Sequence, residues 1–264
     1  MLKALAACAA LGLLSNCAPG DAEAISLRAK GKVHAGLNTA RIGYYGDTRS
    51  FSGDATELYT CPDMPAILSG AGVFNKASIS TWMKPAACGF ARFAAKTGEL
   101  LIFGRADCRV RMVLTTNSTV YCETVINMEA ANTWVHVLGV YNGTGATDAD
   151  KCKIFINGVN QTENYASPPV SISESSSTLL IGGQQIGVYG DTAYWYSDQS
   201  ANATAIYNGG KGHDLRKFGP VAFYTFDHPL DAGGASGLLY DLTGNGYTCS
   251  NTNTETTDIV TDAP

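Results

Sequence analysis

Acidic side chains are considered first, because paired carboxylates can cleave glycosidic bonds by acid/base or nucleophilic catalysis. A retaining mechanism needs two carboxyl groups about 5–5.5 Å apart, and alternating acidic residues on one strand face supply that spacing. The chain has no Glu-x-Asp-x-Glu string. Glu123 and Glu129 are isolated, and Glu163 and Glu174 fall in polar segments. The pattern predicts no catalytic carboxylate pair.

Histidine offers a second route to catalysis, as the base that activates a serine or cysteine nucleophile. His136 lies within the apolar run Trp134–Tyr141, so we expect a core histidine with local hydrogen bonds. His34, His213 and His228 have no nucleophile motif such as G-x-S-x-G nearby. The histidines therefore add no candidate catalytic residue.

Aromatic side chains are the best candidates for ligand contacts, because their flat faces stack on sugar rings at little entropic cost. The predicted ligand-binding residues are Tyr45, Tyr189, Tyr194, Trp195 and Tyr196. Successive side chains of a strand point to opposite faces, so only Trp195 or the pair Tyr194 and Tyr196 can face outward. The alternative for each residue is a place in the core or in a subunit interface.

Composition and charge limit the class of protein. The chain has 264 residues, a formal net charge of −5 and scattered basic residues, so no surface for nucleic-acid phosphates is predicted. Glycine is abundant, and Ser, Thr and Asn cluster between short apolar runs, as tight turns between strands require. Beyond the N-terminus, no long segment keeps the apolar stripe of a helix. We predict an all-β protein.

The segment Asn132–Asn160 carries the clearest strand signals. Its first part, Trp134–Tyr141, is apolar at nearly every position, which predicts a strand covered on both faces. A polar loop and a second strand follow, and that strand ends at Asn157-Gly158. Asn-Gly favours a type I′ turn, because both central residues of that turn adopt positive φ.

Several motifs occur in the order found in one known family. They are ASISTWMKP (Ala77–Pro85), TWVHV (Thr133–Val137), KIFINGV (Lys153–Val159), AIYNGGKGHDL (Ala205–Leu215), VAFYTFD (Val221–Asp227) and LYDLTGNGYT (Leu239–Thr248). In this order the chain resembles laminin-G-like domains of the concanavalin A-like lectin/glucanase superfamily. Its tail resembles one that follows many such modules in bacterial, phage and other viral surface proteins. The resemblance implies a two-sheet antiparallel jelly-roll β-sandwich.

The motif positions predict four segments. These are a hydrophobic leader at residues 1–24, an extended arm or first strand at 25–47, the laminin-G-like sandwich at 48–215, and a C-terminal strand extension with a polar tail at 216–264. The segments Gly43–Asp54 and Gly187–Asp198 share Gly-Asp-Thr and flanking tyrosines. Because the first and last strands of this fold commonly lie side by side, the similarity predicts neighbouring strands, with chance as the alternative.

The leader and the cysteines bear on localisation. Lys3 precedes the apolar run Ala4–Leu14, and Ala22-Glu23-Ala24 fits a cleavage site, which is the layout of a secretory signal peptide. A retained arm would instead need a surface that buries it, such as a neighbouring subunit. Six further cysteines favour disulfides over free thiols and leave their connectivity open: Cys61, Cys88, Cys108, Cys122, Cys152 and Cys249.

Calcium is the ion that the resemblance implies. Many relatives hold it on the sandwich rim with two Asp carboxylates and backbone carbonyls, which suit a hard cation. Asp148 and Asp150, in the polar loop of Asn132–Asn160, are the candidate ligands here. The alternative is that they cap the backbone of their own turn. No other cofactor is predicted.

These observations predict a non-catalytic protein of the extracellular space or of a particle surface. It would be a structural or adhesive subunit of a virion, as in capsid decoration, or of a cell envelope. Its predicted partners are copies of itself or other assembly subunits, contacted through the N-terminal arm, and cell-surface glycans. Nucleic acid and a membrane span are not predicted. The alternatives are a secreted monomeric lectin and, against the carboxylate pattern, a glycoside hydrolase.

Overall fold

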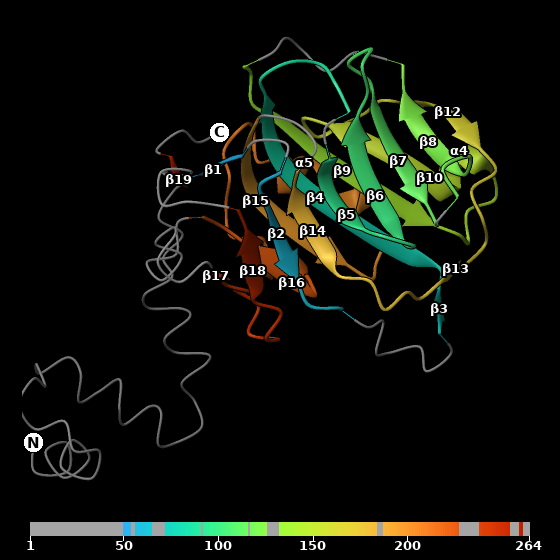
Figure 1. The fold of residues 1–264 in the computed structure, drawn as a ribbon. Coiled ribbons are helices and arrows are strands. Elements are labelled where there is room, and N and C mark those ends of the chain that lie inside the picture. Colours follow the sequence, from blue (N-terminus) through green and yellow to red (C-terminus); the bar gives the residue numbers. More distant parts are fainter. Residues whose placement is uncertain are drawn as a thin grey trace, which may run out of the picture. The chain divides into compact units, whose positions relative to one another are not determined.

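The computed structural model describes residues 50–53, 56–64, 72–90, 92–115, 117–125, 132–183, 187–226, 238–253 and 259–260. All of them lie in the unit Gly46–Pro264. The predicted leader and arm, residues 1–47, fall outside the described residues. Short strands and a few helical turns make up the described chain (Figure 1), which confirms the all-β class.

One antiparallel sheet, here sheet A, contains eight described strands. Their order is β11 (Val159–Asn160), β10 (Cys152–Ile156), β9 (Val135–Asn142), β4 (Lys76–Pro85), β15 (Gly187–Trp195), β1 (Ser50–Gly53) and β19 (Ile259–Val260), and β16 (Ala222–Tyr224) also pairs with β15. The pairing of β1 with β15 aligns Phe51 with Tyr189. The two segments of similar sequence therefore do contribute neighbouring strands.

The facing sheet, sheet B, contains nine described strands. Their order is β12 (Thr162–Ala166), β8 (Tyr121–Thr124), β7 (Val110–Leu114), β6 (Leu100–Gly104), β5 (Arg92–Lys96), β14 (Leu179–Gly182), β2 (Leu58–Cys61), β18 (Cys249–Thr252) and β17 (Leu238–Leu239). A small third sheet pairs β13 (Ile172–Ser173) with β3 (Val73–Phe74). The segment predicted as a C-terminal extension thus supplies strands to both large sheets.

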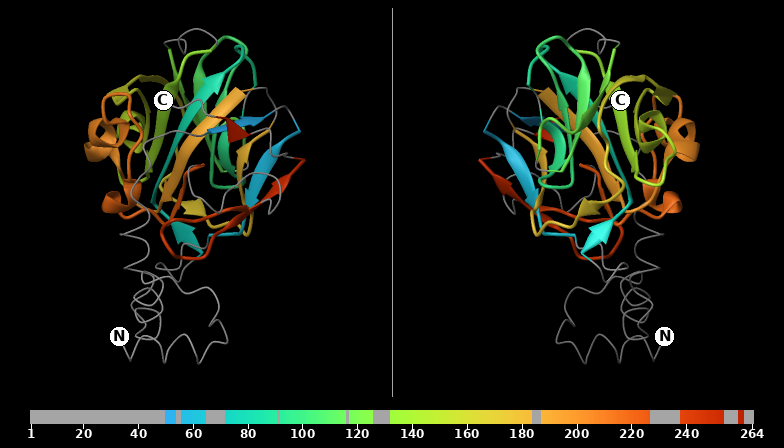
Figure 2. Two further views of the ribbon diagram at one scale, coloured as in Figure 1. Left: turned by 90° about the vertical axis from the view of Figure 1, so that its left-hand side faces the viewer. Right: turned by 90° about the vertical axis from the view of Figure 1, so that its right-hand side faces the viewer.

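The two large sheets pack face to face and bury an apolar core between them (Figure 2). On β9 the residues Val135, Val137 and Tyr141 alternate toward this core. Gly139 belongs to the same set, and a Cβ at this position would lie 2.6 Å from the side chains of both Ile102 and Met112 on sheet B. A side chain at residue 139 would therefore require Ile102 and Met112 to repack, and glycine leaves room for them. The predicted antiparallel jelly-roll sandwich is confirmed.

The predicted Asn157-Gly158 turn is also confirmed. The two residues have φ values of 50° and 78°, as a type I′ turn requires, and they connect β10 to β11. The Asn157 side chain has a second role, since its Oδ1 accepts a hydrogen bond of 2.9 Å from the His136 amide. The turn is thereby tied to β9.

A helical segment, residues 200–218, lies on the outer face of sheet A. It consists of η1 (Ser200–Asn202), α5 (Ala203–Tyr207) and η2 (Leu215–Phe218), and Figure 2 shows it in orange beside the sandwich. The Tyr207 ring packs 5.8 Å from the ring of Trp82 on β4, centroid to centroid. A separate helical turn, α4 (Asp148–Lys151), precedes β10. No helix in the described ranges has the length and apolarity to cross a bilayer.

The six cysteines form three disulfides, as predicted. Cys61–Cys249 joins neighbouring strands β2 and β18, Cys122–Cys152 joins sheet B to sheet A, and Cys88–Cys108 joins the loop after β4 to the β6–β7 turn. These bonds are typical of a protein of an oxidising, extracellular compartment.

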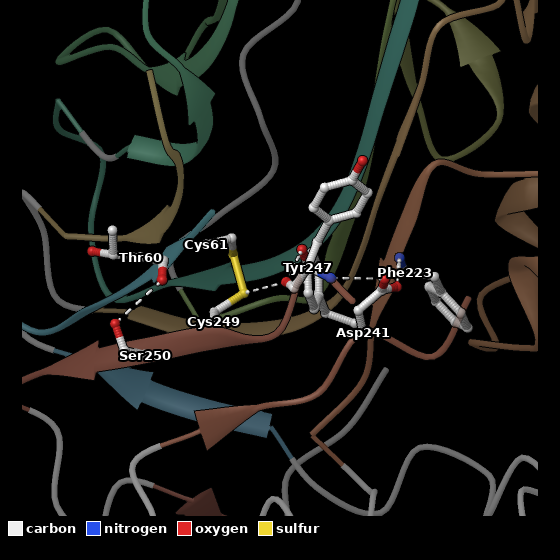
Figure 3. The surroundings of a disulfide bond; sticks show 8 residues. Thr60, Cys61, Phe223, Asp241, Tyr247, Cys249 and Ser250 are labelled. Carbon is white, nitrogen blue, oxygen red and sulfur yellow. Dashed lines mark hydrogen bonds between the residues drawn. A yellow bond between two sulfur atoms is a disulfide. The ribbon is translucent and has the colours of Figure 1, made fainter. Parts of the chain in front are cut away.

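Asp241 organises the chain beside the first of these disulfides (Figure 3). Its carboxylate accepts hydrogen bonds from the amides of Phe223, Thr243 and Tyr247, at 3.2, 3.0 and 3.3 Å. Phe223 belongs to β16 of sheet A, whereas the chain continues from Tyr247 into β18 of sheet B. The D-L-T-G-N-G motif is therefore a structural clamp between the two sheets.

We expect the double variant Cys61→Ser/Cys249→Ser to be less stable than Cys88→Ser/Cys108→Ser. The first bond closes a sequence separation of 188 and the second one of 20. Loop-closure entropy then makes the first bond more stabilising by about 1–2 kcal/mol. Urea unfolding followed by tryptophan fluorescence measures both losses, and equal losses would contradict the expectation.

Candidate functional site

The aromatic residues predicted to bind a ligand are mostly buried. Tyr189, Tyr194 and Trp195 have no exposed surface, and Tyr196 is half-buried. Tyr194 points between the sheets, as its contact with Glu99 on the opposite sheet demonstrates. Tyr45 lies outside the described residues. The prediction of an exposed stacking surface is therefore wrong for the three buried rings.

Trp195 illustrates why strand alternation was not enough to predict exposure. Its side chain points to the outer face of sheet A, as the alternation rule allows. The helical segment covers that face, and the Trp195 indole donates a hydrogen bond of 3.1 Å to the Phe218 carbonyl. An outward direction therefore does not lead to solvent here.

Asp148 and Asp150 lie at the first turn of α4. Asp150 forms a capping box with Thr147: its carboxylate accepts from the Thr147 amide at 3.2 Å, and its amide donates to the Thr147 hydroxyl at 3.2 Å. The Thr147 hydroxyl also donates to this carboxylate at 2.8 Å, and the hydrogen bonds from the hydroxyl and the amide lower the pKa of the Asp150 carboxyl. Asp148 lies 3.8 Å from the Lys151 ammonium. Asp150 thus caps the backbone of its own turn, whereas the Asp148 carboxylate pairs with Lys151.

No three potential metal ligands among His, Cys, Asp and Glu gather anywhere in the part of the chain that the structure describes. Calcium binding by Asp148 and Asp150 stays a prediction.

A buried ionic cluster that was not predicted from the sequence lies between the sheets. Lys96 ends β5 and Glu99 precedes β6, and both side chains have no exposed surface. The Lys96 ammonium forms an ion pair with Glu99, a second one of 3.0 Å with Asp63, and a hydrogen bond of 2.9 Å to the Ser175 carbonyl. Its positive charge is therefore matched on several sides.

The Glu99 carboxylate is matched equally well. One oxygen contacts Lys96 and accepts from the Ser175 amide at 3.0 Å. The other oxygen accepts from the hydroxyls of Tyr194 and Tyr196, at 2.9 and 3.2 Å. Burial and the neighbouring Glu99 carboxylate raise the pKa of both tyrosines well above its ordinary value. The tyrosines thus stay neutral donors.

This cluster has the chemical groups of an acid/base site but not the accessibility. A catalytic carboxylate must reach a substrate atom, whereas Glu99 is buried and saturated by protein donors. A carboxylate that accepts all its hydrogen bonds from the protein, and lies between two sheets, holds the sheets together instead. The sequence Lys-Thr-Gly-Glu at a strand turn predicts this cluster only weakly, because the tyrosines that donate to Glu99 lie almost a hundred residues further along the chain.

His136 and Ser80 form a second pair whose groups, an imidazole and a hydroxyl, could support catalysis. The Ser80 hydroxyl lies 2.8 Å from His136 Nε2, as in nucleophilic catalysis. His136 is only 1% exposed, and the Tyr207 ring covers it at 6.0 Å. Burial lowers the pKa of His136 to about 3, and nearby His213 adds to the effect. The predicted core histidine is confirmed.

A partly exposed group of arginines lies on the outer face of sheet B. Arg105, Arg109 and Arg111 all contact the Glu123 carboxylate, and we call these three residues the arginine cluster. Arg111 pairs directly with Glu123 across β7 and β8. Burial alone would raise the pKa of Glu123, but hydrogen bonds from Arg105 and Arg111 outweigh it and lower the pKa. In the sequence these basic residues looked scattered, and the cluster was not predicted.

The fold and these sites can now be compared with known proteins. A family model described as the concanavalin A-like lectin/glucanases superfamily matches residues 65–198, just over half of the chain. The chain belongs to this superfamily. Its structure is accordingly that of a lectin-like sandwich. A comparison with curated protein sequences finds no match.

Solved structures share this fold at low sequence identity. A candidate carbohydrate binding protein from Bacteroides ovatus has 12% identity and a TM-score of 0.60, over 83% of this chain and 61% of that protein. The chain thus spans about three fifths of that protein's length. The binding domain of botulinum neurotoxin DC, in complex with SialylT, has 14% identity and a TM-score of 0.39, over 51% and 35% of the two chains. A Trypanosoma rangeli sialidase has 10% identity and a TM-score of 0.38, over 51% and 22%.

We expect Glu99→Gln to destabilise the fold strongly. The variant leaves the buried Lys96 ammonium with Asp63 as its remaining carboxylate partner, and breaking a buried ion pair costs about 3–5 kcal/mol. Tyr194→Phe removes one hydrogen bond to a charged group and should cost about 1.5–3 kcal/mol. Urea unfolding measures both. The double variant Lys96→Met/Glu99→Gln should recover part of the lost free energy of unfolding. If the ionic cluster contributes nothing to stability, all three variants will unfold at the wild-type urea concentration.

We also expect acid to destabilise the fold through His136. Its pKa is about 3 in the folded protein and 6.5 in the unfolded chain, so protonation favours the unfolded state. Its contribution to stability is complete above pH 6.5 and is lost as the pH falls toward 3. The free energy of unfolding should therefore fall between pH 6.5 and 5, a range in which ordinary carboxyl groups titrate little. His136→Gln should flatten this decline, and an unchanged slope would contradict the assignment.

Proposed function

We propose that the protein is a non-catalytic carbohydrate-binding protein that acts at an extracellular surface. The observation that carries the proposal is the lectin-like sandwich in which the buried carboxylates Glu99 and Glu123 are both held by protein donors. The candidate role of the Bacteroides ovatus protein, carbohydrate binding, supports the same function. The three disulfides fit an extracellular setting.

Within this function, we infer an adhesive or structural subunit of a virion or cell envelope. The support is in the sequence: a YNGGKG tail (207–212) of the type found in phage, viral and bacterial surface proteins, and an apolar run at Ala4–Leu14. Such a run, if retained, would bind another copy of the chain or another subunit. A secreted monomeric lectin is the second candidate, favoured by the signal-peptide layout of residues 1–24.

A glycan array tests the binding function. The native protein should bind at least one class of saccharide, whereas a mixture of polysaccharides incubated with it should release no reducing sugar. Heat-denatured protein is the control for adsorption to the array. Sugar release that rises with protein concentration would instead support a glycoside hydrolase.

Intact-mass measurement of the protein from its native source separates the two candidates. A chain that keeps residues 1–24 and elutes as an assembly in size-exclusion chromatography would support the subunit. A monomer that starts at about Ile25 would support the secreted lectin and rule out binding through the leader.

A further inference from the structure

The outer face of sheet B combines positive charge with exposed aromatic rings in one place. Strand register aligns Phe103 on β6 with Arg111 on β7, and Arg111 with Glu123 on β8. Arg105 follows two residues after Phe103 and contacts the same carboxylate. The next ring along, Phe90, stacks on Phe103 with centroids 6.3 Å apart. The three strands, the β6–β7 turn and the loop that carries Phe90 thus present one continuous surface.

Covalent bonds hold this surface in shape. The Cys88–Cys108 disulfide ties the loop that carries Phe90 to the turn between Arg105 and Arg109. Within that turn, the Arg105 amide donates to the Arg109 carbonyl at 2.8 Å. A binding surface that is rigid before contact loses little conformational entropy when a ligand arrives.

The arginine cluster has more donors than the protein uses. Arg105 and Arg111 hold the same Glu123 oxygen closely, whereas Arg109 reaches the other oxygen at only 3.4 Å. Arg109 Nε is buried, has no hydrogen-bond partner among the described residues, and lies 3.7 Å from Asp107. The Arg109 side chain is 34% exposed, compared with 29% for Arg105 and 19% for Arg111. Arg109 is therefore the most exposed and least tightly held of the three guanidinium groups, and the one that an anion reaches most easily.

The charge of the surface also favours an anionic ligand. Three guanidinium groups face two carboxylates, Asp107 and Glu123, so the local charge is positive on a chain whose formal net charge is −5. Phe90 is 61% exposed. An exposed aromatic ring beside a partly exposed guanidinium matches a sugar that has both a flat C–H face and an anionic group.

We propose that Arg109 and Phe90 bind an acidic saccharide on this surface. The carboxylate or sulfate of the sugar accepts hydrogen bonds from Arg109, and the sugar ring stacks on Phe90. Glu123 keeps Arg105 and Arg111 in position beneath it. The inference rests on the proposed carbohydrate-binding function and names the class of sugar and the residues that contact it.

Titration with three defined saccharides tests the proposal on the full-length protein. A galacturonate oligosaccharide carries carboxylates, a sulfated dextran oligosaccharide carries sulfates, and a galactan oligosaccharide is neutral. We expect one or both acidic probes to bind and the neutral probe to bind at least about tenfold more weakly, because a hydrogen bond to a charged group contributes that much. The acidic probe that binds identifies the anionic group.

Variants locate the site. Arg109→Gln and Phe90→Ala should each weaken binding of the acidic probe by about tenfold or more. Lys211→Gln is the matched control, because it removes one exposed positive charge beside the helical segment, away from the arginine cluster. It should change the affinity less than about twofold, and circular dichroism should report an intact fold for every variant.

The outcomes separate this inference from the proposed function. Equal losses for Lys211→Gln and Arg109→Gln would mean diffuse attraction of anions and would overturn the proposal. Preferential binding of the neutral probe, unaffected by Arg109→Gln, would also overturn it and leave carbohydrate binding standing. No binding of any saccharide on the array or in titration would remove both.

Discussion

The Lys96–Glu99 ion pair is the constraint on which the sandwich depends. Two buried charges are tolerated only when each is surrounded by partners, and here those partners come from both sheets. A slip of β15 by two residues would move Tyr194 by about 7 Å and leave Glu99 without its hydroxyl donor. The cluster thus selects one register of sheet A against sheet B, while the apolar core between them would accept several.

Local patterns in the sequence were sufficient to predict an all-β protein, and the order of the family motifs was needed to predict the two-sheet sandwich. The Asn157-Gly158 turn follows from the backbone preference of two adjacent residues, and the covered strand β9 follows from its unbroken apolar run. The ionic cluster could not be predicted in this way. Glu99 and Tyr194 meet only because the chain returns to the opposite sheet after 95 residues, and no periodicity encodes that contact.

The same distinction between local patterns and long-range contacts applies to the candidate site. Alternation correctly separated Tyr194 from Trp195, but it could not reveal that residues 200–218 cover the outer face where Trp195 points. The arginine cluster was hidden for a related reason. Arg109 and Arg111 are two residues apart at the start of β7, but their arrangement depends on Glu123 from the next strand and on a disulfide that brings Phe90 alongside. Such sites arise from register and cross-links, which a single sequence does not display.

The Cys61–Cys249 bond also determines how the protein responds to mechanical tension. A pulling force applied to residues before Cys61 and after Cys249 is transmitted through the sulfur atoms, and the strands between them carry none of it. The sequence separation of 188 corresponds to about 600 Å of extended chain that cannot be drawn out while the bond is intact. Reduction of one covalent bond would convert a nearly inextensible link into a long and compliant one.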